Sequence, residues 1–234
     1  MGTIRTDVPG IWQTLFGRAM QLIDDLEQRT GRAQFWTLGG GTVLMLRYRH
    51  RQSKDIDVFF PDPQSLAYLN PRNGGLAESL TMDYADSADH VKLFFPEGEI
   101  DFVASPNLTQ PGFEFATVEK RKVRVETSIE IIAKKMWHRG NEVKARDLFD
   151  LCVVIDHSRD KLATASEFLL RNRDAFLRQI SARHEILQIQ FNEIDVLDYH
   201  RGFDECVELA HDFLIGLKAN PSLRKPSTQL PNDE

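Results

Sequence analysis

The chain has 234 residues, of which 41% are hydrophobic, and its formal net charge is −6. These values are ordinary for a globular protein with one large domain or two small ones, and the acidic balance argues against a general nucleic-acid coat. The two cysteines, and the lack of any apolar run near the roughly 20 residues that cross a bilayer, argue against a disulfide framework and a membrane span. Because the N-terminus also lacks a signal-peptide layout, we expect a soluble protein of the reducing cytoplasm.

The first predicted element is an amphipathic helix that ends at Gly31. Its apolar residues recur at helical spacing, with acids and glutamines between them: Ile11, Leu15, Ala19, Leu22, Ile23 and Leu26. We expect this helix to cover a sheet.

Residues 34–51 predict a strand, a glycine turn and a helix. Gln34 to Leu38 form a short apolar run, three glycines interrupt it, and Thr42 to Arg51 carries apolar residues at helical spacing. A backbone without Cβ atoms can approach a phosphate closely, and the free N–H groups of a helix start attract anions. The stretch therefore predicts a phosphate-binding turn at Gly40 and Gly41, although a glycine triplet alone is more often a plain turn.

Two carboxylates open the next predicted strand, which ends at Phe60. Asp55 and Asp57 are two residues apart and so point to the same face, whereas Ile56 and Val58 face the core. Such a pair would repel unless a cation lay between the two side chains. The spacing therefore predicts a metal site.

These motifs, in this order, resemble those of the AbiEii-type toxins, which are nucleotidyltransferases of the DNA polymerase β superfamily. The resemblance rests on Gly-Gly-Thr at 40–42, Arg47 in the apolar helix, His50-Arg51, Ser53 and Asp55-Ile56-Asp57. It implies an α+β fold in which a mixed-sheet nucleotidyltransferase domain precedes an α-helical C-terminal domain, with the nucleotide between them. It also implies that Gly40, Gly41, Thr42 and Ser53 contact an NTP, although Ser53 equally suits a turn before the strand.

Prolines and glycines predict a loop from Pro61 to Gly75, with one helical turn at Leu66 to Leu69. Val91 to Phe95 and Ile100 to Ala104 then predict a hairpin whose turn is Pro96-Glu97-Gly98-Glu99.

The hairpin supplies the candidates for a third carboxylate. In the resembled superfamily this acid comes from a strand beside the Asp-x-Asp strand, and Asp101 suits that place; Glu99, on the same face, is the alternative. We prefer Asp101 because Glu99 belongs to the turn, and its longer side chain would lie farther from the Asp pair. Asp55, Asp57 and Asp101 would then hold one or two Mg²⁺ ions, because hard oxygen ligands suit a hard cation.

A basic run, Lys120-Arg121-Lys122-Val123-Arg124, follows a Pro- and Gly-rich stretch. Val123 and Val125 alternate with Lys122 and Arg124, which predicts an edge strand with one basic face. The run is either a solvated charge cluster or a strip that faces a polyanion.

A helix from Ile129 to about Arg139 is predicted next, capped by Thr127 or Ser128. Lys135 and Arg139 are four residues apart and lie on one face of this helix.

After Gly140-Asn141, the run Lys144-Ala145-Arg146-Asp147-Leu148-Phe149-Asp150-Leu151 again resembles the AbiEii-type family. By this resemblance Lys135 is catalytic, and Lys135, Arg146 and Asp147 contact the nucleotide. From the residues alone, Arg146 and Asp150 also suit a plain helix pair four residues apart.

The remaining sequence carries no motif. Residues 161–218 favour helices, and their histidines, His184, His200 and His211, lack metal-ligand spacing. From Asn220 onward the apolar residues needed for folding are missing. We therefore divide the chain into a nucleotidyltransferase domain (1–125), a helical C-terminal domain (126–219) and a flexible tail (220–234).

The resemblance implies Mg²⁺-dependent transfer of a nucleoside monophosphate from an NTP to an acceptor hydroxyl. It further implies the toxin of a bacterial toxin–antitoxin pair linked to phage defence, an antitoxin encoded next to it, and RNA as acceptor, in some relatives the tRNA 3′ end. Basic residues around the predicted cleft suit an RNA backbone: Arg47, Arg49, Arg51, Lys54, Lys120, Arg121, Lys122 and Arg124. Two alternatives stay open, a non-catalytic nucleotide-binding sensor and a small-molecule nucleotidyltransferase of the antibiotic-modifying kind.

Overall fold

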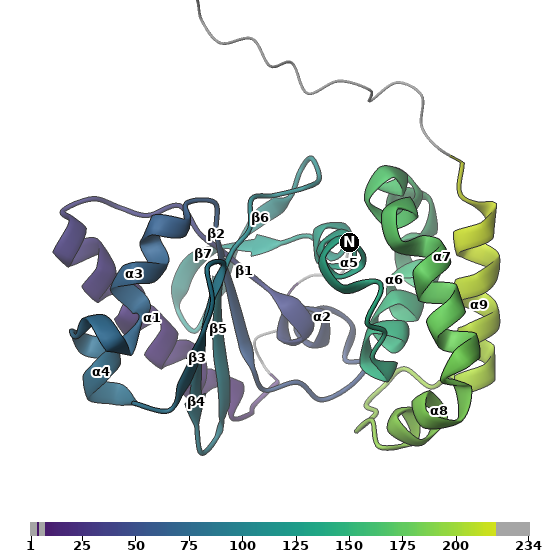
Figure 1. The fold of residues 1–234 in the computed structure, drawn as a ribbon, viewed down its shortest axis with the longest axis horizontal. Coiled ribbons are helices and arrows are strands. Elements are labelled where there is room, and N and C mark those ends of the chain that lie inside the picture. Colours follow the sequence, from purple (N-terminus) through teal and green to yellow (C-terminus); the bar gives the residue numbers. More distant parts are fainter. Residues whose placement is uncertain (1–3, 5–7, 219–234) are drawn as a thin grey trace, which may run out of the picture.

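The computed structural model describes residue 4 and residues 8–218. Within these residues, a seven-stranded mixed sheet has the strand order β3-β4-β5-β2-β1-β7-β6 (Figure 1). Two pairs of neighbouring described strands are parallel, β2 with β5 and β1 with β7, and the others are antiparallel. The strands are β1 (Thr37–Gly39), β2 (Ile56–Phe60), β3 (Tyr84–Asp86), β4 (His90–Phe95), β5 (Gly98–Ala104), β6 (Phe113–Val118) and β7 (Arg121–Glu126).

The helices form two groups, one on each side of the sheet (Figure 1). On the left in Figure 1 lie α1 (Trp12–Thr30), α3 (Leu66–Leu69) and α4 (Leu76–Leu80), with the short 3-10 helices η1 (Pro63–Ser65) and η2 (Pro71–Asn73) beside α3. On the right lie α2 (Gly40–Tyr48), α5 (Ser128–Arg139), α6 (Ala145–Ala163), α7 (Ser166–Ala182), α8 (His184–Asn192) and α9 (Phe203–Gly216). The predicted α+β class, a mixed sheet followed by helices, is confirmed.

Alternation along β2 separates a core face of the sheet from an open one. Ile56, Val58 and Phe60 are fully buried, whereas Asp57 and Phe59 between them are partly exposed. Helix α1 packs against β2 and β5, and its apolar stripe joins the same core. Because each fully buried apolar side chain of this size stabilises the fold by about 1.5–3 kcal/mol, this core fixes which face carries the acids.

The strand register places one row of residues across the open face. Lys92 pairs with Asp101, Asp101 with Asp57, and Asp57 with Gly39. Leu38 pairs with Val125, which continues the row to Glu126, and Glu126 pairs with Phe113 on the edge strand. Side chains of directly paired residues lie on the same face, so residues distant in the sequence meet here.

The C-terminal part is joined to the loop between α2 and β2 by backbone hydrogen bonds. Residues 195–198 run antiparallel to residues 49–52: Gln52 N donates to Asp195 O (2.8 Å) and Leu197 N to His50 O (3.0 Å). The buried apolar residues also form one continuous cluster that includes both Leu15 and Leu214. We therefore propose the division between residues 125 and 126 as one between two parts of the chain that share a single hydrophobic core.

Several predicted elements are confirmed, including the first helix, the turn at Leu66 to Leu69, the hairpin, and the cap of α5, where Thr127 Oγ1 accepts from Glu130 N. The prediction of an edge strand at the basic run is wrong, because β7 is paired on both sides, with β1 and with β6. The first strand also lies later than predicted, at Thr37–Gly39, because Gly39 pairs with Asp57.

The elements β3, β6 and α4 were not predicted, nor were the short 3-10 helices η1 and η2. In β6, Phe113 and Phe115 alternate with less apolar residues, which is a strand signal, but the preceding prolines and glycines favoured a loop. No helix in the described part of the chain is long and apolar enough to cross a bilayer. The predicted tail, 220–234, lies outside the described residues.

Candidate active site

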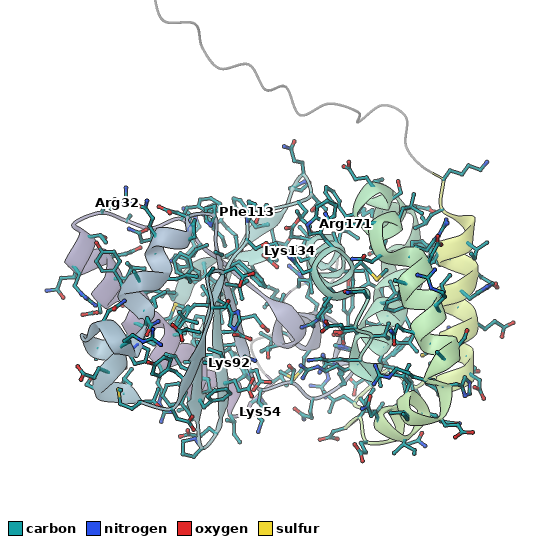
Figure 2. All side chains as sticks on the ribbon, viewed as in Figure 1. Arg32, Lys54, Lys92, Phe113, Lys134 and Arg171 are labelled. Carbon is teal, nitrogen blue, oxygen red and sulfur yellow. The ribbon has the colours of Figure 1, made fainter. Side chains whose placement is uncertain are left out.

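A cleft of about 200 Å³ opens between the row on the sheet and the start of the helical part. In Figure 2, Lys92 lies on the sheet and Lys134 on α5, and both line this cleft. Most of the predicted site residues line it as well: Gly40, Gly41, Ser53, Asp55, Asp57, Asp101, Lys135 and Arg146. Thr42 and Asp147 are buried and do not line the cleft.

Asp57 and Asp101 lie side by side on the parallel strands β2 and β5. Burial, and then the neighbouring Asp101 carboxylate, raise the pKa of Asp57. Asp101 Oδ2 lies 2.9 Å from Lys92 Nζ, but its Oδ1 is buried without a hydrogen-bond partner in the described chain. Asp101 therefore presents an oxygen that no described residue satisfies, next to the Asp57 carboxylate.

These oxygens fit a hard cation such as Mg²⁺, because they are carboxylate ligands held close together. Asp55 also lines the cleft, and its Oδ1 accepts a hydrogen bond from Glu99 N (3.1 Å). Accordingly, no three His, Cys, Asp or Glu side chains of the described residues are arranged as a ready metal cage. Glu99, the alternative third acid, is bound to Lys92 at 2.7 Å.

The glycines are required by the site's own side chains. Gly40 has a φ of +74°, and a Cβ there would lie 1.8 Å from Asp57 Oδ2. A Cβ on Gly41 would lie 2.6 Å from Arg51 Nη2, and one on Gly39 would lie 2.3 Å from Glu126 Oε2. The turn thus lets the backbone pass beneath the acids, a reason for glycine that the sequence did not indicate.

Thr42 and Ser53 join the start of α2 to the segment before β2. Thr42 Oγ1 donates to the backbone oxygen of Asp55 (2.6 Å), and the Ser53 hydroxyl lies 3.1 Å from the same Oγ1. Thr42 is 1% exposed and so positions Asp55 from within, whereas Ser53 reaches the cleft.

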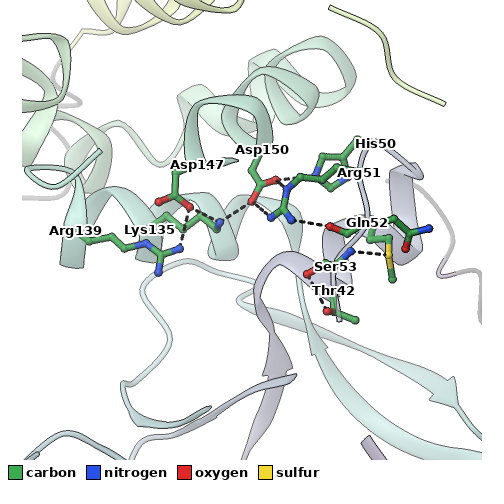
Figure 3. Close-up of polar contacts among 10 residues, drawn as sticks. Thr42, His50, Arg51, Gln52, Ser53, Lys135, Arg139, Asp147 and Asp150 are labelled. Atoms are coloured by element: carbon green, nitrogen blue, oxygen red, sulfur yellow. Dashed lines mark hydrogen bonds and ion pairs between the residues drawn. The ribbon is translucent and has the colours of Figure 1, made fainter. Parts of the chain in front are cut away.

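A chain of ion pairs connects the motif at residues 144–151, the second motif, to the motif at residues 40–57, the first motif (Figure 3). Arg51 makes two bonds to Asp150, Nε to Oδ1 at 2.7 Å and Nη2 to Oδ2 at 2.8 Å. His50 Nε2 lies 2.7 Å from Asp150 Oδ1, and Lys135 Nζ lies 2.6 Å from both Asp150 Oδ2 and Asp147 Oδ1. Although burial raises it, the charges of Arg51 and Lys135 hold the pKa of Asp150 well below its ordinary value. The interpretation of Asp150 as a helix partner of Arg146 is therefore wrong.

The wall opposite the acids is positive. Lys135 and Arg139 line the cleft while pairing with Asp147, whereas Arg146 is exposed and makes no hydrogen bond or ion pair with a described residue. Burial, together with the charges of Arg139 and Arg146, lowers the pKa of Lys144 beside them. Cations held this close together favour a polyanionic ligand.

Lys92 and Glu126 are among the cleft-lining residues that were not predicted as site residues. Lys92 faces Asp101 across the hairpin, and the register set by the Pro96 to Glu99 turn could have identified it. Glu126, the last residue of β7, is fully buried. Burial raises its pKa to about 7 although Lys134 Nζ lies 2.5 Å from its Oε1. Its Oε2 has no described partner.

Solved structures similar to this chain include JHP933 from Helicobacter pylori (15% identity, 88% of this chain and 93% of that one, TM-score 0.43). Others are a putative nucleotidyltransferase from H. pylori (16%, 87% and 96%, TM-score 0.44) and the lincosamide antibiotic adenylyltransferase LnuA with lincomycin bound (16%, 58% and 92%, TM-score 0.39). At such identities and TM-scores, nothing about substrates follows from them. No curated protein matches the chain.

The family comparison is decisive, because one model covers most of the chain. Residues 22–225 match the model described as "Nucleotidyl transferase AbiEii toxin, Type IV TA system". That range contains every predicted site residue and the whole cleft. The chain therefore belongs to the AbiEii family of nucleotidyltransferase toxins, enzymes of type IV toxin–antitoxin systems that use an NTP and are matched by an antitoxin.

Proposed function

We propose that this toxin transfers a nucleoside monophosphate from an NTP to the 3′-hydroxyl of an RNA, a tRNA in particular, in a Mg²⁺-dependent reaction. The observation that carries the proposal is the pairing of Asp57 and Asp101 at one level of the sheet, opposite a positive wall. We place the reaction in the cytoplasm, where NTP and tRNA meet, and connect it with phage defence.

In this reaction the acceptor oxygen forms a bond to the α-phosphorus, and the bond from that phosphorus to the β-phosphate breaks. Pyrophosphate leaves with the bonding electron pair. Asp57 and Asp101, together with Asp55, would hold Mg²⁺, which when bound neutralises phosphate charge. Asp101, whose Oδ1 lacks a described partner, accepts the proton of the acceptor hydroxyl.

The opposite wall binds the triphosphate. Arg146 pairs with no described residue, so its guanidinium can contact phosphate oxygens directly as a planar fork. Lys135 is the catalytic cation that faces the phosphates from the sheet-facing side of α5, held in place by Asp147 and Asp150. Gly40, Gly41 and Ser53 line the end of the cleft next to the acids, where they would contact the other end of the triphosphate.

The test incubates the purified protein with each α-labelled NTP, Mg²⁺, tRNA, total RNA and total protein. We expect label in RNA, at the 3′ end, with one NTP preferred, and no label with the Asp57→Asn variant. Label in protein or in a small molecule would replace RNA as the acceptor. NTP binding without any transfer would support the nucleotide-binding sensor instead.

A further inference from the structure

A group of fully or partly exposed aromatic and basic side chains lies toward the β6 edge of the sheet, outside the cleft. We call it the aromatic platform; it consists of Phe35, Phe113, Phe115, Lys122 and Arg124. Phe115 and Phe35 are 59% and 43% exposed. The Phe113 ring packs edge-on against both of them, at centroid distances of 5.5 Å from Phe35 and 5.8 Å from Phe115.

Two cations lie over these rings. The Arg124 guanidinium is 4.6 Å from the Phe35 centroid and 5.8 Å from that of Phe115, and Lys122 Nζ is 5.0 Å from the Phe115 centroid. Within the described chain neither cation pairs with a carboxylate, unlike the adjacent Arg121, which binds Asp24. Their positive charge is thus free to attract an anion on a chain that is acidic as a whole.

The platform lies on the same face of the sheet as the cleft. Phe113 on β6 is paired with Glu126 on β7, and Glu126 lines the cleft. Two residues farther along the same pair of strands, Phe115 on β6 is paired with Arg124 on β7. From Asp57 the row passes through Gly39 and Glu126 to Phe113, three strand spacings or about 14 Å. In Figure 2, Phe113 lies at the end of the sheet nearest Lys134, another cleft residue.

We propose that the aromatic platform binds the single-stranded segment of the acceptor RNA next to its reactive 3′ end, stacking bases on Phe35 and Phe115. Every base has a π-face, so stacking accepts any sequence, and Lys122 and Arg124 would contact the flanking phosphates. The proposal rests on the proposed function for the identity of the acceptor, but its binding contacts lie outside the catalytic cleft.

Protection of the sheet edge does not explain the cluster. Edge strands are guarded by charges of their own, but β6 carries no lysine or arginine; both cations belong to the inner strand β7. A protein strand added to β6 would use backbone hydrogen bonds, and would leave the cations over the rings without a role. The combination of rings and unpaired cations favours nucleic acid.

The experiment measures binding of a fluorescein-labelled single-stranded RNA of mixed sequence by anisotropy, with the full chain and its variants. Phe115→Ala should weaken binding about 5- to 100-fold, and Phe115→Trp should keep it. Lys122→Ala should lower the slope of log affinity against log salt by roughly 0.7. NTP affinity, measured by calorimetry, should stay at the wild-type value in all three variants.

Tyr68→Ala is the matched control. Tyr68 is also an exposed aromatic residue with a cation over its ring, Arg29 at 5.2 Å, but it belongs to α3 on the other side of the sheet. This variant should bind the RNA as the wild type does. Equal losses for Tyr68→Ala and Phe115→Ala would overturn the proposal.

Further outcomes separate the platform from the reaction. If the wild type does not bind single-stranded RNA, or if Phe115→Ala binds it unchanged, the platform is not an RNA site. If only neutralisation by the cognate antitoxin is lost in Phe115→Ala, the surface docks a protein and the proposal is wrong. If platform variants lose RNA binding although no nucleotide is ever transferred to RNA, the platform stands and the proposed function fails.

Discussion

At the scale of single residues, the Asp57 carboxylate is expected to lower the stability of the fold while it serves the reaction. This carboxylate packs on Gly40 and beside Asp101, and burial and Asp101 both raise its pKa. Asp57→Asn keeps the volume and removes the charge, so we expect transferase activity to fall about 100-fold or more. The same variant should melt at a higher temperature than the wild type without Mg²⁺, because the like-charge repulsion is gone.

Mg²⁺ titrations provide the control for this prediction. A cation that binds only the folded protein stabilises it, so Mg²⁺ should raise the melting temperature of the wild type and leave Asp57→Asn unchanged. Asp101→Asn should resemble Asp57→Asn, whereas Glu99→Gln should be mild because Glu99 is bound to Lys92 near the turn. Full activity in Asp57→Asn would remove the metal from this pair of acids.

Glu126 should give the protein a measurable pH dependence of stability. Burial raises its pKa from the ordinary 4.5 to about 7, so between these values the folded state holds a proton that the unfolded state has lost. The contribution of Glu126 to stability therefore falls as pH rises from 4.5 to 7, by up to about 1.4 kcal/mol per pH unit, and is constant above that window. The Glu126→Gln variant carries no such proton.

Denaturant unfolding of the wild type and Glu126→Gln at several pH values checks this sign. The variant should lose less free energy of unfolding than the wild type between pH 4.5 and 7. The two curves should run parallel above pH 8, where Glu126 is ionised in both states. Parallel curves across the whole range would mean that Glu126 titrates normally.

The sequence predicted acids better than it predicted their neighbours. The spacing of Asp55 and Asp57 is local, so their common face follows from strand geometry alone. Lys92 faces Asp101 through the local register of the hairpin. Glu126 joins the site only through pairing between strands that are distant in the sequence, and that order, β2-β1-β7, is decided by packing.

At the scale of elements, α6 carries two motif residues with different roles, Arg146 and Asp150. Asp150 is fully buried and binds Arg51, His50 and Lys135, whereas Arg146, one turn earlier, is exposed to the cleft. Asp150→Ala should lower the free energy of unfolding by about 3–5 kcal/mol, because it leaves buried cations without a partner. Arg146→Ala should leave stability within about 0.5 kcal/mol and weaken NTP binding.

Chemical denaturation and calorimetric NTP titration on both variants make this comparison. A large loss of stability in Arg146→Ala, or none in Asp150→Ala, would reverse the two roles. Lys135→Ala is a less clean probe, because Lys135 both lines the cleft and binds Asp147 and Asp150, so it should lose stability and NTP affinity together.

Periodicity predicted the long helices well and the sheet edge poorly. Helix α1 is marked by an apolar stripe over 19 residues. Strand β3 is short and largely exposed, and the strand signal of β6 was masked by the prolines and glycines before it. The basic run in β7 looked like an edge because its charges alternate, but the strand beyond it, β6, covers that position. The alternation of polar and apolar residues indicates which face of a strand is polar. Whether the strand has one or two neighbouring strands depends on residues distant in the sequence.

At the scale of the whole molecule, the segment between α8 and α9 supports the site without carrying a recognised motif. Residues 195–198 bind the backbone of residues 49–52, the segment that presents His50 and Arg51 to Asp150. Nothing in the sequence of 195–198 marks this contact, since it depends on the path of α7 and α8. The overall charge of −6 likewise conceals that cations gather at the cleft and the platform.

Expression in a bacterial host tests the molecule as a toxin. A nucleotidyltransferase that extends RNA 3′ ends would block their use, so wild-type protein should slow growth. The Asp57→Asn variant, expressed to the same level, should not, because it keeps the fold and loses the charge that the reaction needs. RNA from the arrested cells should carry extra 3′ nucleotides, and co-expression of a cognate antitoxin should restore growth. Growth arrest by both proteins would point to a toxic effect unrelated to the acids, and arrest with unmodified RNA would move the acceptor to another class of molecule.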